Sequence, residues 1–238
     1  MCSPTESVTA VLLYGSCARG DSRPGSDVDL LIVGELSIPI PKEKTISVTA
    51  YAESHLLAMA QTGSLFVLHL REEARILVDR RKVIPPILSA WKSPNYDLLF
   101  EGMRAAASVL DVPTGKVKAA VLRRVTLFVL RSVLYGECAR RGTPTFAMSS
   151  VATILGDSRI WELFEDVHRV RDTQFIAKAM TLLDGYLGGT QRNAFGGLEP
   201  LAVNYYKRYP MASHLAVQLL TDGVGINYAS APADWVAE

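Results

Sequence analysis

The sequence predicts an α/β (α+β) N-terminal domain with a mixed sheet, followed by an all-α helical bundle. Two observations support this fold class. The first third of the chain alternates short apolar runs with turn-forming residues, and the rest carries apolar residues at helical spacing. The character changes around Pro85 and Pro86, so the boundary is expected between residues 80 and 95. We therefore divide the chain into residues 1–90 and residues 91–238.

Four segments of the first domain have the pattern of strands. The first two are mostly apolar runs, typical of strands buried on both faces, and the third alternates with β-branched residues. The fourth is short and suits a sheet edge. These segments are Val8–Tyr14, Val28–Val33, Ile46–Tyr51 and Arg75–Asp79. Residues 53–61 predict a helix that ends before Gly63.

The second domain has apolar residues at the three- and four-residue spacing of amphipathic helices. Glycine and proline residues separate the segments. The expected helices are Tyr96–Leu110, Lys116–Arg140, Ser149–Leu155, Ile160–Arg171, Phe175–Tyr186 and Leu198–Leu220. The last stretch, Thr221–Glu238, has no clear period and is expected to be a loose tail.

Composition excludes several classes of protein. About half of the 238 residues are apolar and the net charge is +1, which gives no support for a globally basic nucleic-acid binder. Three cysteines do not make a disulfide framework, and we interpret them as reduced thiols. The N-terminal residues have no basic segment and no apolar core, so no signal peptide is expected, and no apolar run reaches the length of a membrane span. A cytoplasmic protein without a membrane partner is expected.

Two carboxylates at the start of the second strand suggest a metal site. Residues i and i+2 of a strand point to the same side, so Asp27 and Asp29 can converge on cations. Hard divalent ions such as Mg²⁺ bind carboxylate oxygens and substrate phosphates. Two such ions clamp the attacking and leaving oxygens of a phosphoryl displacement. An acid within so apolar a run is costly unless it is paired or bound to metal.

The residues that follow the first strand suggest a phosphate site. Gly15 allows close approach of the backbone to a phosphate, and the Ser16 hydroxyl can donate to a phosphate oxygen or cap a helical turn. Arg19 can add a bidentate phosphate contact, or it can pack and pair with Asp21. If the first two strands pair, the phosphate and metal groups lie at the same end of both.

The string Tyr14-Gly15-Ser16-Cys17-Ala18-Arg19-Gly20-Asp21, followed by Ser26-Asp27-Val28-Asp29, resembles the signature of the DNA polymerase β-like nucleotidyltransferase superfamily. It is most similar to minimal and antibiotic-modifying nucleotidyltransferases, over residues 11–34. The resemblance implies that Gly15 and Ser16 bind the triphosphate, with Arg19 and Ser26 as further nucleotide-binding candidates. It also implies that Asp27 and Asp29 bind two Mg²⁺ ions as the catalytic carboxylates.

One part of the family pattern is missing. Members of the superfamily usually have a third carboxylate, a metal ligand or general base, on the next strand. In the segment Ile46–Tyr51 the candidate positions are Ser47, Thr49 and Tyr51, and none is acidic. Glu43 precedes this strand and Glu53 follows it, so these two are the possible substitutes.

The expected function is Mg²⁺-dependent transfer of a nucleoside monophosphate from an NTP to a hydroxyl group, with release of pyrophosphate. The acceptor is a protein side chain, as in toxin–antitoxin modules, an RNA 3′ end such as that of tRNA, or a small molecule. The helical domain is expected to bind this acceptor or a protein partner. The alternative is a catalytically weak nucleotide-binding protein or an antitoxin-type interaction protein. His69 is interpreted as a partly buried, hydrogen-bonded histidine rather than a proton carrier.

Overall fold

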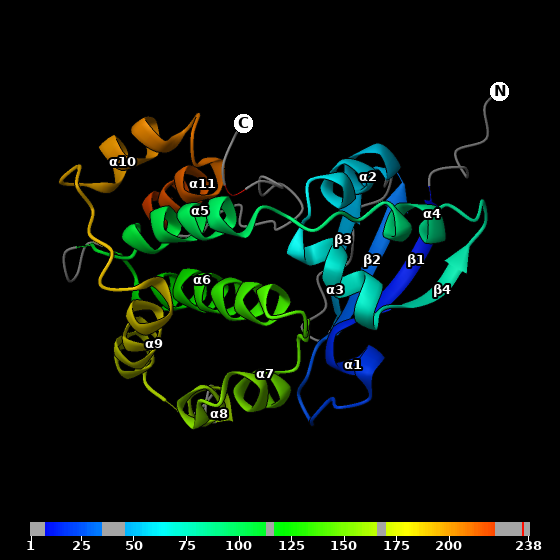
Figure 1. The fold of residues 1–238 in the computed structure, drawn as a ribbon, viewed down its shortest axis with the longest axis horizontal. Coiled ribbons are helices and arrows are strands. Elements are labelled where there is room, and N and C mark those ends of the chain that lie inside the picture. The colour runs from blue at the N-terminus through cyan, green and yellow to red at the C-terminus, as the bar shows by residue number, and fades with distance from the viewer. Residues whose placement is uncertain (1–7, 35–45, 113–116, 166–169, 222–234, 236–238) are drawn as a thin grey trace. The chain divides into compact units, whose positions relative to one another are not determined.

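The computed structural model describes residues 8–34, 46–112, 117–165, 170–221 and 235 (Figure 1). The described chain forms two compact units, with the boundary after Pro94. The boundary predicted from the sequence lies between residues 90 and 91. We call the part up to Pro94 the N-terminal unit and the part from Asn95 onwards the helical unit. None of the helices within these ranges is long and apolar enough to cross a membrane.

The N-terminal unit is built on a four-stranded mixed sheet with the strand order β3-β2-β1-β4. Its strands are β1 (Val8–Tyr14), β2 (Val28–Gly34), β3 (Ile46–Tyr51) and β4 (Arg75–Asp79). β1 is antiparallel to both β2 and β4, and β2 is parallel to β3. The predicted mixed sheet and its strands are confirmed, with β2 one residue longer than expected.

One face of the sheet forms the core of this unit. Leu12, Leu31 and Val33 have no exposed surface, whereas Leu13 and Ile32 on the opposite face are only partly buried. The prediction that β1 and β2 are buried on both faces is therefore wrong. Periodicity cannot show this difference, because both faces of these strands are apolar.

In the described part of this unit four helices accompany the sheet: α1 (Gly15–Arg19), α2 (Glu53–Gln61), α3 (Leu65–Glu73) and α4 (Ile84–Ser89). α2 was expected, but α3 and α4 were not. α4 begins with two prolines in its first turn, where a missing N–H costs nothing, and Asp79 accepts bonds from its first backbone amides. Pro85 and Pro86 thus start a helix and do not mark a break.

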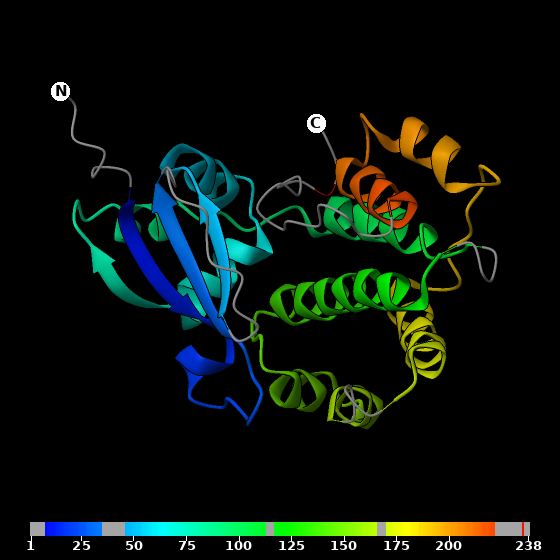
Figure 2. The same ribbon diagram turned by 180° about the vertical axis from the view of Figure 1, so that it is seen from behind.

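The helical unit confirms the expected bundle, with α6 at its centre (Figures 1 and 2). α6 packs against α5, α7, α9 and α11. The side chain of Trp235 stacks on Phe128 of α6. The helices are α5 (Tyr96–Ser108), α6 (Ala119–Arg140), α7 (Met148–Leu155), α8 (Ser158–Glu165), α9 (Asp172–Leu187), α10 (Leu198–Tyr205) and α11 (Pro210–Leu220).

Two expected helices of this unit differ from the structure. The segment Leu198–Leu220 forms two helices, because Pro210 lacks the amide hydrogen that would continue the first helix. The helix expected over Ile160–Arg171 begins earlier and is described to Glu165. Residues 166–169 lie outside the described ranges, and α9 begins just after Arg171.

Candidate functional site

The pairing of β1 with β2 brings the residues predicted to bind phosphate and the residues predicted to bind metal to one edge of the sheet. Tyr14, the last residue of β1, pairs with Asp29 near the start of antiparallel β2. Gly15 and Ser16 follow Tyr14 directly in α1, and Asp27 lies one residue before β2. The structure therefore brings Gly15, Ser16, Asp27 and Asp29 together.

Gly15 lies directly against the Asp29 carboxylate. A Cβ atom added to Gly15 would lie 2.5 Å from Asp29 Oδ2, which is closer than side chains approach one another. Gly15 also has φ of +73°, a left-handed conformation that glycine adopts most readily. Both facts require glycine at this position, so the backbone of α1 and the carboxylate of β2 are in direct contact.

The segment α1 forms a single helical turn. Gly20 ends it in a left-handed conformation, and the amides of Gly20 and Asp21 both donate to the Ser16 carbonyl oxygen, at 2.9 and 3.1 Å. Ser16 is half-buried in the first turn. In such a turn the amides at the start have no partner within the helix, and they are the groups that bind anions.

A tight turn leads the chain into Asp27. The Ser26 amide donates to the Arg23 carbonyl oxygen at 2.9 Å, and the Arg23 amide donates to Ser26 Oγ at 2.9 Å. Pro24 and Gly25, with φ of +89° at Gly25, suit a type II turn. The Ser26 hydroxyl thus has a role within the loop, and the Asp27 side chain is exposed.

Arg19 is paired with two acids. Its Nε lies 3.1 Å from Asp21 Oδ2, and its Nη1 lies 2.6 Å from Glu73 Oε2 at the end of α3. The side chain is 20% exposed. Of the two interpretations of Arg19, this geometry favours packing and pairing over a phosphate contact. Sequence analysis did not identify Glu73, because α3 itself was not predicted.

The neighbouring strand offers no acid to Asp29. In the parallel register Ser47 is the partner of Asp29, so the two side chains lie on the same face of the sheet. Thr49 and Tyr51 on that face are buried, and Tyr14 OH lies 3.4 Å from Thr49 Oγ1. Burial is the first cause that raises the pKa of Tyr14 to about 12, so this hydroxyl stays protonated.

Of the two candidate third acids, the structure describes Glu53, which does not join this site. Glu53 follows β3 at the opposite end of the sheet from Asp29, where it pairs with Arg81 at 3.6 Å and lines a cavity with Gly34. Glu43 lies outside the described residues. Within the described ranges no three His, Cys, Asp or Glu residues are grouped so that they could hold a metal ion.

His69 lies in the interior of the N-terminal unit. Its Nε2 is 3.1 Å from Glu73 Oε2, its side chain is 16% exposed, and its ring meets the Tyr14 ring edge-on at 5.6 Å. These contacts agree with a hydrogen-bonded, partly buried histidine. They leave His69 without the exposure that a proton carrier to a bound substrate needs.

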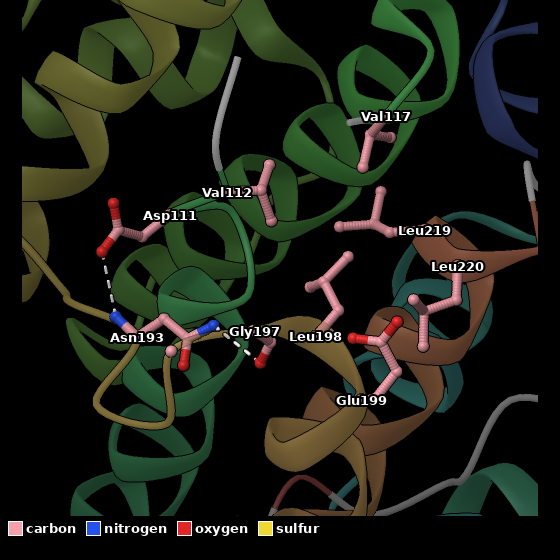
Figure 3. Close-up of a pocket in the computed structure, with 10 residues that line it drawn as sticks. Asp111, Val112, Val117, Asn193, Gly197, Leu198, Glu199, Leu219 and Leu220 are labelled. Carbon is pink, nitrogen blue, oxygen red and sulfur yellow. Dashed lines mark hydrogen bonds between the residues drawn. The ribbon is translucent and has the colours of Figure 1, made fainter. Parts of the chain in front are cut away.

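A cavity of about 630 Å³ lies within the helical unit (Figure 3). Asp111 and Glu199 contribute carboxylates, and the wall also includes Asn193 and the apolar side chains of Val112, Val117, Leu198, Leu219 and Leu220. The Asp111 carboxylate accepts hydrogen bonds from the backbone amide of Asn193 and from the Arg192 side chain. Two carboxylates repel a triphosphate, so the cavity is unsuited to the NTP.

Residues 1–88 match the family model described as "Nucleotidyltransferase domain". The chain carries a nucleotidyltransferase domain. The match includes β1, α1 and β2, which hold Gly15, Ser16, Asp27 and Asp29.

Two solved structures were also found to be similar. One is a nucleotidyltransferase-like protein from Exiguobacterium sibiricum, with 14% identity, coverage of 92% of this chain and 83% of that chain, and a TM-score of 0.31. The other is a spectinomycin adenyltransferase from Enterococcus faecialis with ATP and spectinomycin, with 9% identity, coverage of 92% and 93%, and a TM-score of 0.37. TM-scores this low carry no weight, so the domain is identified by the match of residues 1–88. A comparison with curated proteins finds no match.

Proposed function

We propose that the nucleotidyltransferase domain transfers a nucleoside monophosphate from a Mg²⁺-bound NTP to a hydroxyl group and releases pyrophosphate. The observation that carries this proposal is the contact between Gly15 and the Asp29 carboxylate. A backbone that can approach a phosphate and a carboxylate that can bind Mg²⁺ meet there at one edge of the sheet. Ser16 follows Gly15 directly and adds a hydroxyl group to the proposed phosphate site. Asp27 precedes Asp29 by two residues and adds a second carboxylate to the proposed metal site.

The donor set fits magnesium. Asp27 and Asp29 supply hard oxygen ligands, and Mg²⁺ in NTP sites takes one or two carboxylates together with substrate phosphates. Two bound ions would neutralise the triphosphate and polarise the reacting phosphorus. The amides at the start of α1 and the Ser16 hydroxyl are the proposed groups for the β and γ phosphates.

The reaction balances without another cofactor. The acceptor oxygen forms a bond to the α-phosphorus, and the bond from that phosphorus to the oxygen bridging to the β-phosphate breaks. Pyrophosphate leaves with the bonding electrons. The acceptor proton passes to solvent or to an oxygen of the bound phosphates, because no described residue of β3 is a carboxylate.

The helical unit is proposed to bind the acceptor or a protein partner. The three acceptor classes remain a protein side chain, an RNA 3′ end and a small molecule. The lack of an acid on β3 supports a second candidate function, that of a catalytically weak nucleotide-binding or antitoxin-type protein. In the first function the protein moves the α-phosphate of an NTP, and in the second it binds the NTP without transfer or acts as an interaction protein.

Label transfer from NTPs tests this proposal. The protein is incubated with each of the four NTPs labelled at the α-phosphate, with Mg²⁺, and with bulk tRNA, cell lysate proteins or lysate small molecules. We expect α-label, and not γ-label, to enter one acceptor fraction, and EDTA to prevent it. Binding of NTP without label transfer to any fraction would favour the second function. Failure to bind any NTP would contradict the first function and would leave only the antitoxin-type form of the second.

A carboxylate at position 47 offers a separate test. Ser47 is exposed and is the register partner of Asp29, so Ser47→Asp places an acid beside the proposed metal ligand. We expect this variant to transfer label about 10-fold faster or more, since a positioned base contributes roughly 10²–10⁴-fold in other enzymes. Ser47→Asn, which has the same shape without the charge, is the control. An equal rate for both variants would show that deprotonation does not limit transfer.

A further inference from the structure

A group of three polar side chains connects the proposed phosphate-binding segment α1 to helix α3. Arg19 ends α1, and its Nη1 donates to Glu73 Oε2 at 2.6 Å. The same oxygen lies 3.1 Å from His69 Nε2, one turn earlier on α3. The side chains of Arg19, Glu73 and His69 are only 20%, 11% and 16% exposed. This group is therefore largely buried in the N-terminal unit, and it joins segments that are 54 residues apart in the sequence.

The position of Glu73 is unfavourable without its partners. It is the last residue of α3, and the C-terminal end of a helix carries partial negative charge that repels a carboxylate. Burial raises the pKa of Glu73, but its bonds with His69 and Arg19 outweigh burial and lower that pKa below its ordinary value. The carboxylate at this position is thus held charged by groups that include the last residue of α1.

The segment α1 needs outside support to keep its shape. It has five residues, and a single helical turn is unstable alone because nucleation costs more than one hydrogen bond returns. Ala18 packs into the interior at 2% exposure, and Gly20 caps the turn. The ion pair from Arg19 to Glu73 adds a fixed attachment to α3. Because Gly15 contacts Asp29, a shift of α1 would move both halves of the site.

We propose that Glu73 is a positioning residue for nucleotide binding: through Arg19 it holds α1 in the conformation that receives the triphosphate. Arg19 then acts as an anchor and leaves phosphate contacts to the amides of α1 and to Ser16. This inference rests on the proposed function of Gly15 and Ser16. Glu73 lies outside the string that resembles the superfamily signature, on a helix that the sequence pattern did not predict.

Affinity for Mg²⁺–NTP and amide exchange of α1 test the proposal together. For Glu73→Gln in the full chain, we expect the Kd of the tightest-binding NTP to rise about 10-fold or more, since Arg19 keeps Asp21 as a partner but loses the charged partner that ties α1 to α3. Hydrogen exchange at the Gly20 and Asp21 amides, both bonded to Ser16, should quicken by a similar factor. Glu72→Gln is the matched control, because Glu72 is adjacent and, among the residues that the structure describes, pairs with Arg71 alone, at 3.6 Å.

A double-mutant cycle separates positioning from general loss of structure. If Glu73 acts through Arg19, Arg19→Met should weaken NTP binding as Glu73→Gln does, and the double variant should be no weaker than either alone. Strict additivity, or wild-type affinity and exchange in Glu73→Gln, would overturn the proposal. Global instability would raise amide exchange throughout the N-terminal unit, whereas lost positioning raises it in α1. If wild-type protein binds no NTP, the proposed function fails, and amide exchange still decides whether Glu73 anchors α1.

Discussion

Replacing Gly15 with alanine should abolish binding of Mg²⁺–NTP and transfer of label, with the protein still folded. The new Cβ would lie 2.5 Å from Asp29 Oδ2, so the carboxylate or α1 must move. A left-handed conformation for a residue with a side chain adds about 1–2 kcal/mol of strain. We expect NTP affinity to fall about 100-fold or more, since a displacement of about 1 Å at a reactive site has effects of this order. Isothermal titration with Mg²⁺–NTP measures the loss.

Gly20→Ala is the matched control for this variant. Gly20 has φ of +84°, close to that of Gly15, but an added Cβ would meet nothing within 4 Å. Both variants therefore carry similar backbone strain, and only Gly15→Ala disturbs Asp29. We expect both to lower the melting temperature by similar amounts, while Gly20→Ala keeps most of its NTP affinity. Equal loss of affinity in the two variants would contradict the role assigned to the contact with Asp29.

The double variant Asp27→Asn, Asp29→Asn should lose label transfer altogether, by about 10³-fold or more. Asparagine keeps the shape of each side chain but removes the charge that binds Mg²⁺ and offsets the triphosphate. Of the single variants, Asp29→Asn should be the more damaging, because Asp29 contacts Gly15 whereas Asp27 is exposed. Titration of activity with Mg²⁺ at fixed NTP measures the effect, and the single variants should need more Mg²⁺ for half-maximal rate.

Glu53→Gln is the control for the aspartate variants. Sequence analysis named Glu53 as a possible third acid, but the structure places it at the opposite end of the sheet, in a pair with Arg81. We therefore expect Glu53→Gln to transfer label at the wild-type rate. Label transfer that persists in the double aspartate variant would refute the assignment of the metal site. A rate loss in Glu53→Gln as large as in Asp29→Asn would show that Glu53 reaches the metals.

Local patterns were sufficient for much of the fold. All four strands were predicted within one residue, because each apolar or alternating run ends at turn-forming residues. Helix α3 was missed because its apolar run is nearly continuous and has no clear polar face, and α4 because it opens with two prolines. The break between α10 and α11 was missed because apolar spacing continues across Pro210. In each case the pattern fitted more than one conformation.

The candidate site was likewise predictable from the sequence only in part. The sequence by itself determined which residues are the candidates for binding phosphate and metal, since Gly15-Ser16 and Asp27-x-Asp29 lie within one short stretch beside two strands. Only the tertiary structure decided three further points: that Gly15 contacts Asp29, that Ser47 is the register partner of Asp29, and that Glu73 holds Arg19. Strand register and contacts across 54 residues arise from packing of the whole unit, and no local spacing encodes them.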